Sequence, residues 1–178
     1  MTIIEFYDRN AIENVVSTLL CHPEQVVFVG DSKRRLNAAV ENCRTIAEGR
    51  GLAVEFFTVT IGKNNLTEIV QTLTQLNTRQ INPGALPTGI ETMLRSFVEK
   101  AGTLSSAERR ILNYYIDGHD IAEIPELAFI SIHTVKKHNR SIYQKLGVAS
   151  RDELMLYIEL FRCCDRLEEL TGAEAETE

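Results

Sequence analysis

The chain has 178 residues, 44% of them hydrophobic, and a formal net charge of −6. This many apolar side chains can fill one medium or two small cores, which excludes a disordered or fibrous chain. No stretch approaches the roughly 20 uncharged residues that a membrane span needs, and acidic residues stand where a secretory signal has its basic segment. We therefore expect a cytoplasmic protein without a membrane partner.

Short runs of β-branched and aromatic residues alternate with helical stretches in the N-terminal half of the chain. These runs cover residues 3–6, 25–30 and 54–61. Each is bounded by polar residues or glycine, and the helix after the first run is expected to stop before Pro23. Because strands that alternate with helices pair in parallel, the sequence predicts a small three-stranded parallel α/β domain over residues 1–80.

A stretch without hydrophobic period separates this domain from a wholly helical remainder. Residues 78–89, TRQINPGALPTG, predict a hinge, and with the helix that follows they give a connecting segment over residues 81–102. Residues 103–171 predict a domain of four helices, so the fold class is α/β plus all-α. Their expected N-caps are Ser105, Asp120, Ser131 and Ser150. The last helix is predicted to run to about Leu170, before an acidic tail over residues 172–178.

The predicted helix from Ser131 to Leu146 separates into an apolar stripe and a basic face. The stripe consists of Ile132, Val135, Ile142, Tyr143 and Leu146. From Ser131 to Arg151 there are five cations and no acidic residue, so nothing in this segment cancels their field. A basic, hydrogen-bonding helix face behind a short helix is suited to the major groove of DNA, and the alternative is an ordinary solvated surface. The candidate DNA-binding residues are Ser131, His133, Thr134, Lys136, Lys137, His138, Arg140, Gln144 and Lys145.

Three segments of this half resemble the LuxR/GerE-type helix-turn-helix family. They are LSSAERRIL from Leu104, ISIHTVKKH from Ile130 and SIYQKLGVASRDEL from Ser141. The resemblance implies a four-helix domain that binds double-stranded DNA. It places Lys136, Lys137 and Arg140 toward the bases, whereas Ser131, Thr134, His138 and Lys145 meet or support the DNA backbone.

Two departures from the family pattern affect these expectations. Pro125 and Ala128 replace the Ala and Leu that are usual in the first helix of the helix-turn-helix. Because proline inside a helix removes a backbone bond, we expect this helix to be short, shifted or kinked at Pro125. Ser141 replaces the usual Asn, so we expect one contact to the DNA backbone to differ from the family pattern.

The last predicted helix has two apolar faces. One face carries residues at alternating spacings of four and three, as in a coiled-coil seam. These residues are Leu156, Leu160, Cys163, Leu167 and Leu170. We predict that they form a homodimer interface, and the alternative is that both faces pack within one chain.

The N-terminal half is similar to the start of CARF-type sensor domains, through IIEFYDRNAIENVVSTL and PEQVVFVGD. The resemblance covers roughly residues 3–75 and implies a Rossmann-like sensor or dimerisation domain, although the chain reaches the hinge before the fourth strand that helps to bind cyclic oligoadenylates. Where the second strand meets the next helix, the candidate ligand residues are Gly30, Asp31, Ser32 and Lys33. Such a strand end favours a small anionic or nucleotide ligand, and a plain turn and cap is the alternative.

No catalytic group, metal site or cofactor site is predicted. The four histidines and four cysteines lack the spacing of metal ligands, and no nucleophile has a base assigned to it. The sequence therefore predicts a DNA-binding transcription regulator that is not an enzyme. The alternative is a ligand-sensing or protein-interaction module whose helix-turn-helix does not bind DNA specifically.

Overall fold

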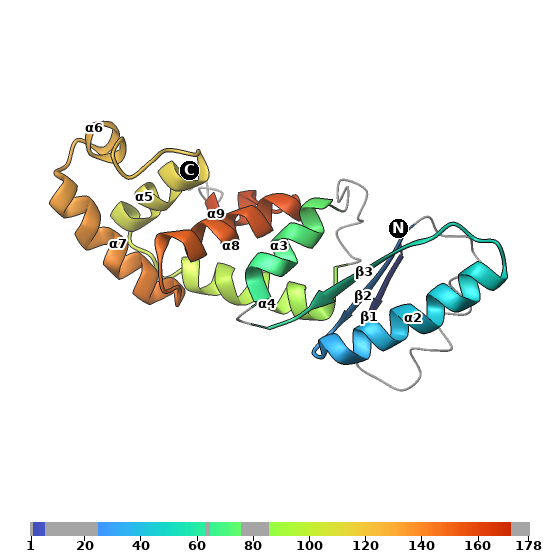
Figure 1. Ribbon diagram of the computed structural model, residues 1–178. Coiled ribbons are helices and arrows are strands. Elements are labelled where there is room, and N and C mark those ends of the chain that lie inside the picture. The colour runs from blue at the N-terminus through green and yellow to red at the C-terminus, as the bar shows by residue number, and fades with distance from the viewer. Residues whose placement is uncertain (1, 6–24, 63–64, 76–85, 172–178) are drawn as a thin grey trace, which may run out of the picture. The chain divides into compact units, whose positions relative to one another are not determined.

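The computed structural model describes residues 2–5, 25–62, 65–75 and 86–171 (Figure 1). The chain divides into two compact units, Met1–Thr92 and Met93–Glu178. The helix predicted before Pro23, most of the predicted hinge and the acidic tail lie outside the described residues.

The first unit contains a small sheet of parallel strands. The strands are β1 (Thr2–Glu5), β2 (Gln25–Gly30) and β3 (Glu55–Thr60), in the order β1-β2-β3. Helix α2 (Lys33–Gly49) connects β2 to β3, and α3 (Leu66–Gln75) follows β3. The expected parallel pairing is confirmed, and a core cluster joins the sheet to α2 through Val26, Phe28, Leu36, Ala39, Val40 and Cys43.

Three of the described helices that follow are capped by serine. The helices, in chain order, are α4 (Thr88–Ala101), α5 (Ser106–Ile116), α6 (Ile124–Ala128), α7 (Ile132–Leu146), α8 (Arg151–Cys163) and α9 (Glu168–Thr171). The side chains of Ser105, Ser131 and Ser150 each accept a backbone N–H of the first turn of α5, α7 and α8. The predicted caps at these three serines are therefore confirmed, and each satisfies a donor that the helix itself leaves unpaired.

Helix α6 is shortened around Pro125, as expected. It spans only Ile124–Ala128, and Pro125 lies in its first turn, where a proline costs no helical hydrogen bond. The helix ends at Phe129, whose φ of 57° is left-handed, and Ile130 donates its N–H to the Pro125 carbonyl at 3.1 Å. The tight turn between α6 and α7 is thus fixed by backbone contacts.

The prediction of one continuous last helix was wrong. Helix α8 ends at Cys163, and a separate short helix, α9, begins at Glu168. Asp165 has a φ of 55°, and Arg166 donates its N–H to the Phe161 carbonyl at 3.0 Å while Asp165 donates to Arg162 at 3.2 Å. This pair of bonds is the Schellman motif, which terminates helices, here with aspartate instead of glycine in the left-handed position.

The buried side of α7 differs in three places from the predicted stripe, one of which is Tyr143, since it is only half-buried. Val135, Ile142 and Leu146 are buried, but Ile132 is 37% exposed because it opens the helix, beside the exposed turn that follows α6. Asn139 is buried instead, and its Nδ2 donates to the Tyr115 hydroxyl of α5 at 2.6 Å. A buried amide needs such a partner, so this bond explains how a polar residue can lie in the core.

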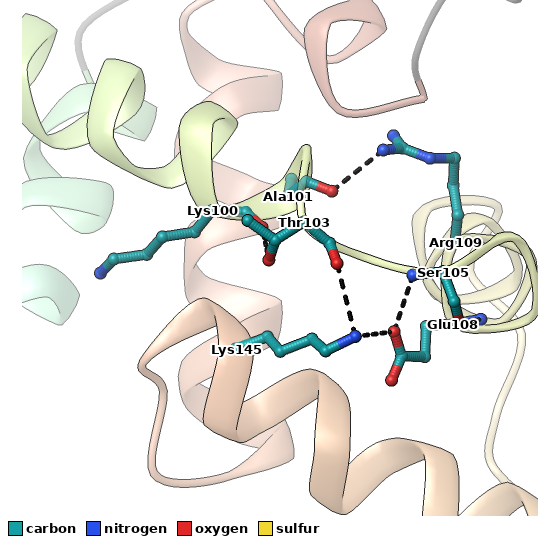
Figure 2. Close-up of polar contacts among 7 residues, drawn as sticks. All are labelled: Lys100, Ala101, Thr103, Ser105, Glu108, Arg109 and Lys145. Atoms are coloured by element: carbon teal, nitrogen blue, oxygen red, sulfur yellow. Dashed lines mark hydrogen bonds and ion pairs between the residues drawn. The ribbon is translucent and has the colours of Figure 1, made fainter.

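A second polar contact joins the start of α5 to the end of α7 (Figure 2). The carboxylate of Glu108 is 5% exposed and lies 2.6 Å from the Lys145 ammonium, which also donates to the Thr103 carbonyl at 3.4 Å. The same carboxylate accepts the Ser105 backbone N–H at 2.8 Å. Burial by itself would raise the pKa of Glu108, but hydrogen bonds from Lys145, Ser141 and Ser105 outweigh it and lower the pKa from 4.5 to about 2.

Because its pKa is lower in the folded chain, Glu108 stabilises the fold above pH 4.5, and this contribution is lost as the pH falls from 4.5 toward 2. The variant Glu108→Gln should lose about 1–3 kcal/mol of unfolding free energy at neutral pH. Its stability should then depend less on pH than that of the wild type in this acidic range. Chemical denaturation at a series of pH values measures both effects.

The variant Glu99→Gln, at an exposed position of α4, is the matched control. It should retain the acid sensitivity of the wild type. An acid sensitivity in Glu108→Gln equal to that of the wild type would show that this carboxylate does not stabilise the folded state.

Candidate nucleic-acid interface

The outer face of α7 carries three cations that project into solvent. Lys136, Lys137 and Arg140 are exposed, and within the described ranges none of them forms an ion pair. His133 and Gln144 are exposed on the same helix, and His138 is half-buried. This face therefore presents positive charge together with hydrogen-bonding groups, which are the two properties that binding to a nucleic acid requires.

The first turn of α7 is stabilised by two candidate residues. The Ser131 hydroxyl accepts the Thr134 backbone N–H at 3.2 Å, and the two side-chain oxygens lie 3.0 Å apart. Ser131 is exposed and Thr134 is half-buried. The cap therefore uses the Ser131 hydroxyl, and the Thr134 hydroxyl lies within hydrogen-bond distance of it.

Two of the five cations in the acid-free segment are paired with acids from other parts of the chain. Lys145 contacts Glu108, as described above, and Arg151 lies 3.0 Å from the carboxylate of Asp120. The guanidinium of Arg151 also lies over the Tyr115 ring, 5.8 Å from its centroid. The unpaired positive charge of the segment is thus concentrated on Lys136, Lys137 and Arg140.

A surface hollow of about 350 Å³ adjoins these cations. It is lined by Ile121, Lys136, Asn139, Arg140, Tyr143 and Ala149. The Oδ1 atom of Asn139 has no hydrogen-bond partner in the described structure. Sequence reasoning missed Asn139, although its helical angle places it in the middle of the predicted apolar stripe, where a polar residue signals a specific buried contact.

The residues predicted for dimerisation do not lie on one exposed seam. Leu160 and Leu170 are fully buried, whereas Leu156, Cys163 and Leu167 are partly exposed. The break between α8 and α9 also interrupts the spacing on which the predicted seam depended. Only three of the five side chains are therefore accessible in this chain.

The predicted ligand residues lie together between β2 and α2. Gly30 is buried at the end of β2, Asp31 is exposed, and Ser32 is the N-cap residue of α2. The Lys33 ammonium lies 3.1 Å from Glu68 of α3, so this cation already has an acidic partner.

Neither a metal-ligand cluster nor a helix able to cross a membrane occurs in the part of the chain that the structure describes. No group of three or more His, Cys, Asp or Glu residues there could hold a metal ion. None of the described helices is both long and apolar enough to span a bilayer.

The comparisons with known proteins bear on the helical unit. Residues 102–158 match the family described as bacterial regulatory proteins, luxR family. A comparison with curated proteins finds no significant match. The matched segment begins just after α4 and includes α5, α6, α7 and part of α8, whereas the resemblance of residues 3–75 to CARF-type sensors is not confirmed. Residues 102–158 therefore form a helix-turn-helix domain of the LuxR family.

Proposed function

We propose that the protein is a DNA-binding regulator of transcription that places α7 in the major groove of double-stranded DNA. The observation that carries this proposal is the set of three exposed cations on α7, Lys136, Lys137 and Arg140, for which the described structure offers no acidic partner. The family of residues 102–158 supports the same function, because LuxR-type helix-turn-helix domains are typically regulators without enzymatic activity.

The chemistry of these side chains divides their proposed roles. Lysine and arginine donate to guanine O6 and N7 in the major groove, so Lys136, Lys137 and Arg140 are the proposed base-reading residues. His133 and Gln144 are exposed before and after these three cations in the sequence of α7. Their side chains are able to donate to base edges or phosphates. The hydroxyls of Ser131 and Thr134 lie at the start of α7, where phosphate contacts are common.

We further propose that the protein acts as a homodimer, so that two α7 helices meet successive turns of a pseudo-palindromic site. The accessible candidates for the dimer contact are Leu156, Cys163 and Leu167. The N-terminal α/β unit is the proposed sensor or dimerisation unit.

A second candidate function is a protein-interaction module that does not read DNA. Large apolar side chains are exposed around the turn of the helix-turn-helix, where Phe129 is 90% exposed and lies between Leu127 at 38% and Ile132 at 37%. Exposed apolar clusters of this kind often mark protein contacts. Retention on immobilised random-sequence DNA at low salt separates the two candidates, because a module without DNA affinity passes through the column.

Replacing a base-reading cation should weaken specific binding more than random binding. The DNA site is first selected from random fragments with the purified protein. For Lys137→Ala and Arg140→Ala we expect a loss of about 1–3 kcal/mol each on the selected site and a smaller loss on random DNA. Fluorescence anisotropy with labelled duplexes measures both affinities.

The variant Arg44→Ala controls for the loss of one charge, because Arg44 is exposed on α2 and pairs with Glu41 at 3.0 Å. It should change binding to both kinds of DNA only slightly. Equal losses on selected and random DNA for Arg140→Ala would contradict a base-reading role and leave only a phosphate contact.

The substitution Lys145→Ala tests whether this residue holds α7 or contacts DNA directly. Because Lys145 is bonded to Glu108 and Thr103, we propose that it acts mainly through the fold. The sequence-based expectation was a direct phosphate contact, whose loss would lower the dependence of log K on log salt by about 0.9. For Lys145→Ala we expect a lower stability of the fold and a nearly unchanged dependence of log K on log salt. A decrease of about 0.9 in that dependence would instead show that Lys145 contacts a phosphate.

A further inference from the structure

The carboxyl ends of β2 and β3 meet beside the start of α2. Gly30 ends β2, and only Asp31 and Ser32 separate it from the helix. In the parallel register Gly30 is opposite Thr60, the last residue of β3, and the Ile61 N–H donates to the Gly30 carbonyl at 2.8 Å. Ligands of parallel α/β sheets bind at such strand ends.

The first turn of α2 carries positive charge with nothing to balance it on the helix itself. The helix begins with Lys33, Arg34 and Arg35, and its first turn contains no acidic residue. The Ser32 side chain makes no capping hydrogen bond. The first helical hydrogen bond of α2 runs from the Leu36 N–H to the Ser32 carbonyl, at 3.0 Å. The N–H groups before Leu36 therefore have no helical acceptor, and the helix dipole makes this end favourable for an anion.

A buried hydroxyl without a partner lies at the same place. Thr60 is 7% exposed, and its Oγ1 atom has no hydrogen-bond partner in the described structure. Phe56 lies four residues earlier on β3, and its ring stacks on Phe28 in the core that α2 covers. Because side chains of a strand alternate between the two faces, Thr60 lies on the face that α2 covers, next to Gly30, which has no side chain.

These groups belong to different elements at the same end of the sheet. The α2 N–H groups lie along the helix axis, the Thr60 hydroxyl comes from the sheet, and Arg34 and Arg35 are exposed at the rim. Lys33 is held by Glu68 at 3.1 Å, so the two arginines are the available cations. Several donors in different directions suit a tetrahedral dianion better than a planar carboxylate.

We propose that the start of α2 and the end of β3 bind the phosphate group of a small ligand, with Thr60 Oγ1 as a buried donor. The exposed carboxylate of Asp31 is an acceptor at the same turn. The ribose hydroxyls of a nucleoside monophosphate are donors that this carboxylate could accept. The site is separate from the proposed DNA surface on α7. Phosphate binding here and DNA binding by α7 can therefore succeed or fail independently.

The experiment uses the full chain in phosphate-free buffer and the isosteric variant Thr60→Val. Inorganic phosphate and adenosine 5′-monophosphate are compared with chloride at equal ionic strength, and the melting temperature of the α/β unit and the Kd are measured. One or both phosphates should raise the melting temperature of the wild type, because a ligand that binds only the folded chain stabilises it. A shift with inorganic phosphate alone identifies a free-anion site, and a shift with the nucleotide identifies a phosphomonoester site.

The variant Thr60→Val should bind the active ligand about tenfold or more weakly, since it loses a hydrogen bond to a charged group. Without ligand it should melt at the same temperature as the wild type or higher, because no partner of Oγ1 is lost. The control Thr58→Val removes a hydroxyl on the same strand and face and should keep the full shift.

Three outcomes would overturn the site. One is the absence of any phosphate-dependent shift in the wild type, and another is an equal shift in Thr60→Val. The third is a lower melting temperature of Thr60→Val in phosphate-free buffer, which would mean that the hydroxyl already has a partner within the chain.

Discussion

The position of α7 depends on a buried carboxylate. Glu108 joins three segments, since it accepts the N–H that starts α5 and the ammonium at the end of α7, while that ammonium also reaches the Thr103 carbonyl that follows α4. The Asn139–Tyr115 bond joins the same two helices at the other end. Apolar side chains alone would let α7 rotate or slide along α5 at low cost, whereas two directional bonds fix both its rotation and its axial position. The direction in which the basic face points is therefore set by polar contacts on the opposite side of the helix.

This arrangement separates the cations that hold the domain from those that remain available. In the sequence the five cations of the acid-free segment look equivalent. In the folded chain, Glu108 and Asp120 are supplied by α5 and by the segment after it, and they pair with Lys145 and Arg151. The Lys145 pair cannot be given up for a phosphate without leaving the buried Glu108 carboxylate unsatisfied, which is costly, whereas Asp120 is exposed to solvent. The local charge pattern therefore overestimates the number of available cations, and contacts distant in sequence leave three of the five, all on α7, without an acidic partner in the described structure.

Local signals predicted local structure well in this chain. Serine at the start of a helix, a proline that shortens α6 and the period of Val135, Ile142 and Leu146 each act within a few residues, and the structure agrees with them. The errors came from interactions that the pattern does not contain. Asn139 is buried because Tyr115 provides a partner 24 residues away. The heptad spacing of apolar residues continues past Cys163, but the helix ends there in a Schellman motif with Asp165 in the left-handed position. Because glycine is the usual residue at that position, aspartate only weakly indicates the end of a helix.

Buried polar atoms without partners are concentrated where external partners are proposed. Within the described residues four such side-chain atoms occur, in Thr60, Asn113, Asn139 and Arg151. Asn139 lines the hollow beside Lys136 and Arg140, and Arg151 packs on Tyr115, the hydrogen-bond partner of Asn139. Thr60 is opposite Gly30, at the end of the strand that leads to α2. A folded chain normally satisfies its buried polar groups, so an unsatisfied one indicates water or a ligand that completes it. Asn113 has no such setting, and nothing in the structure explains it. Thr60 Oγ1 and Arg151 Nε are donors, and an anion would supply the acceptor that each lacks, whereas Asn139 Oδ1 is an acceptor and needs a donor such as water.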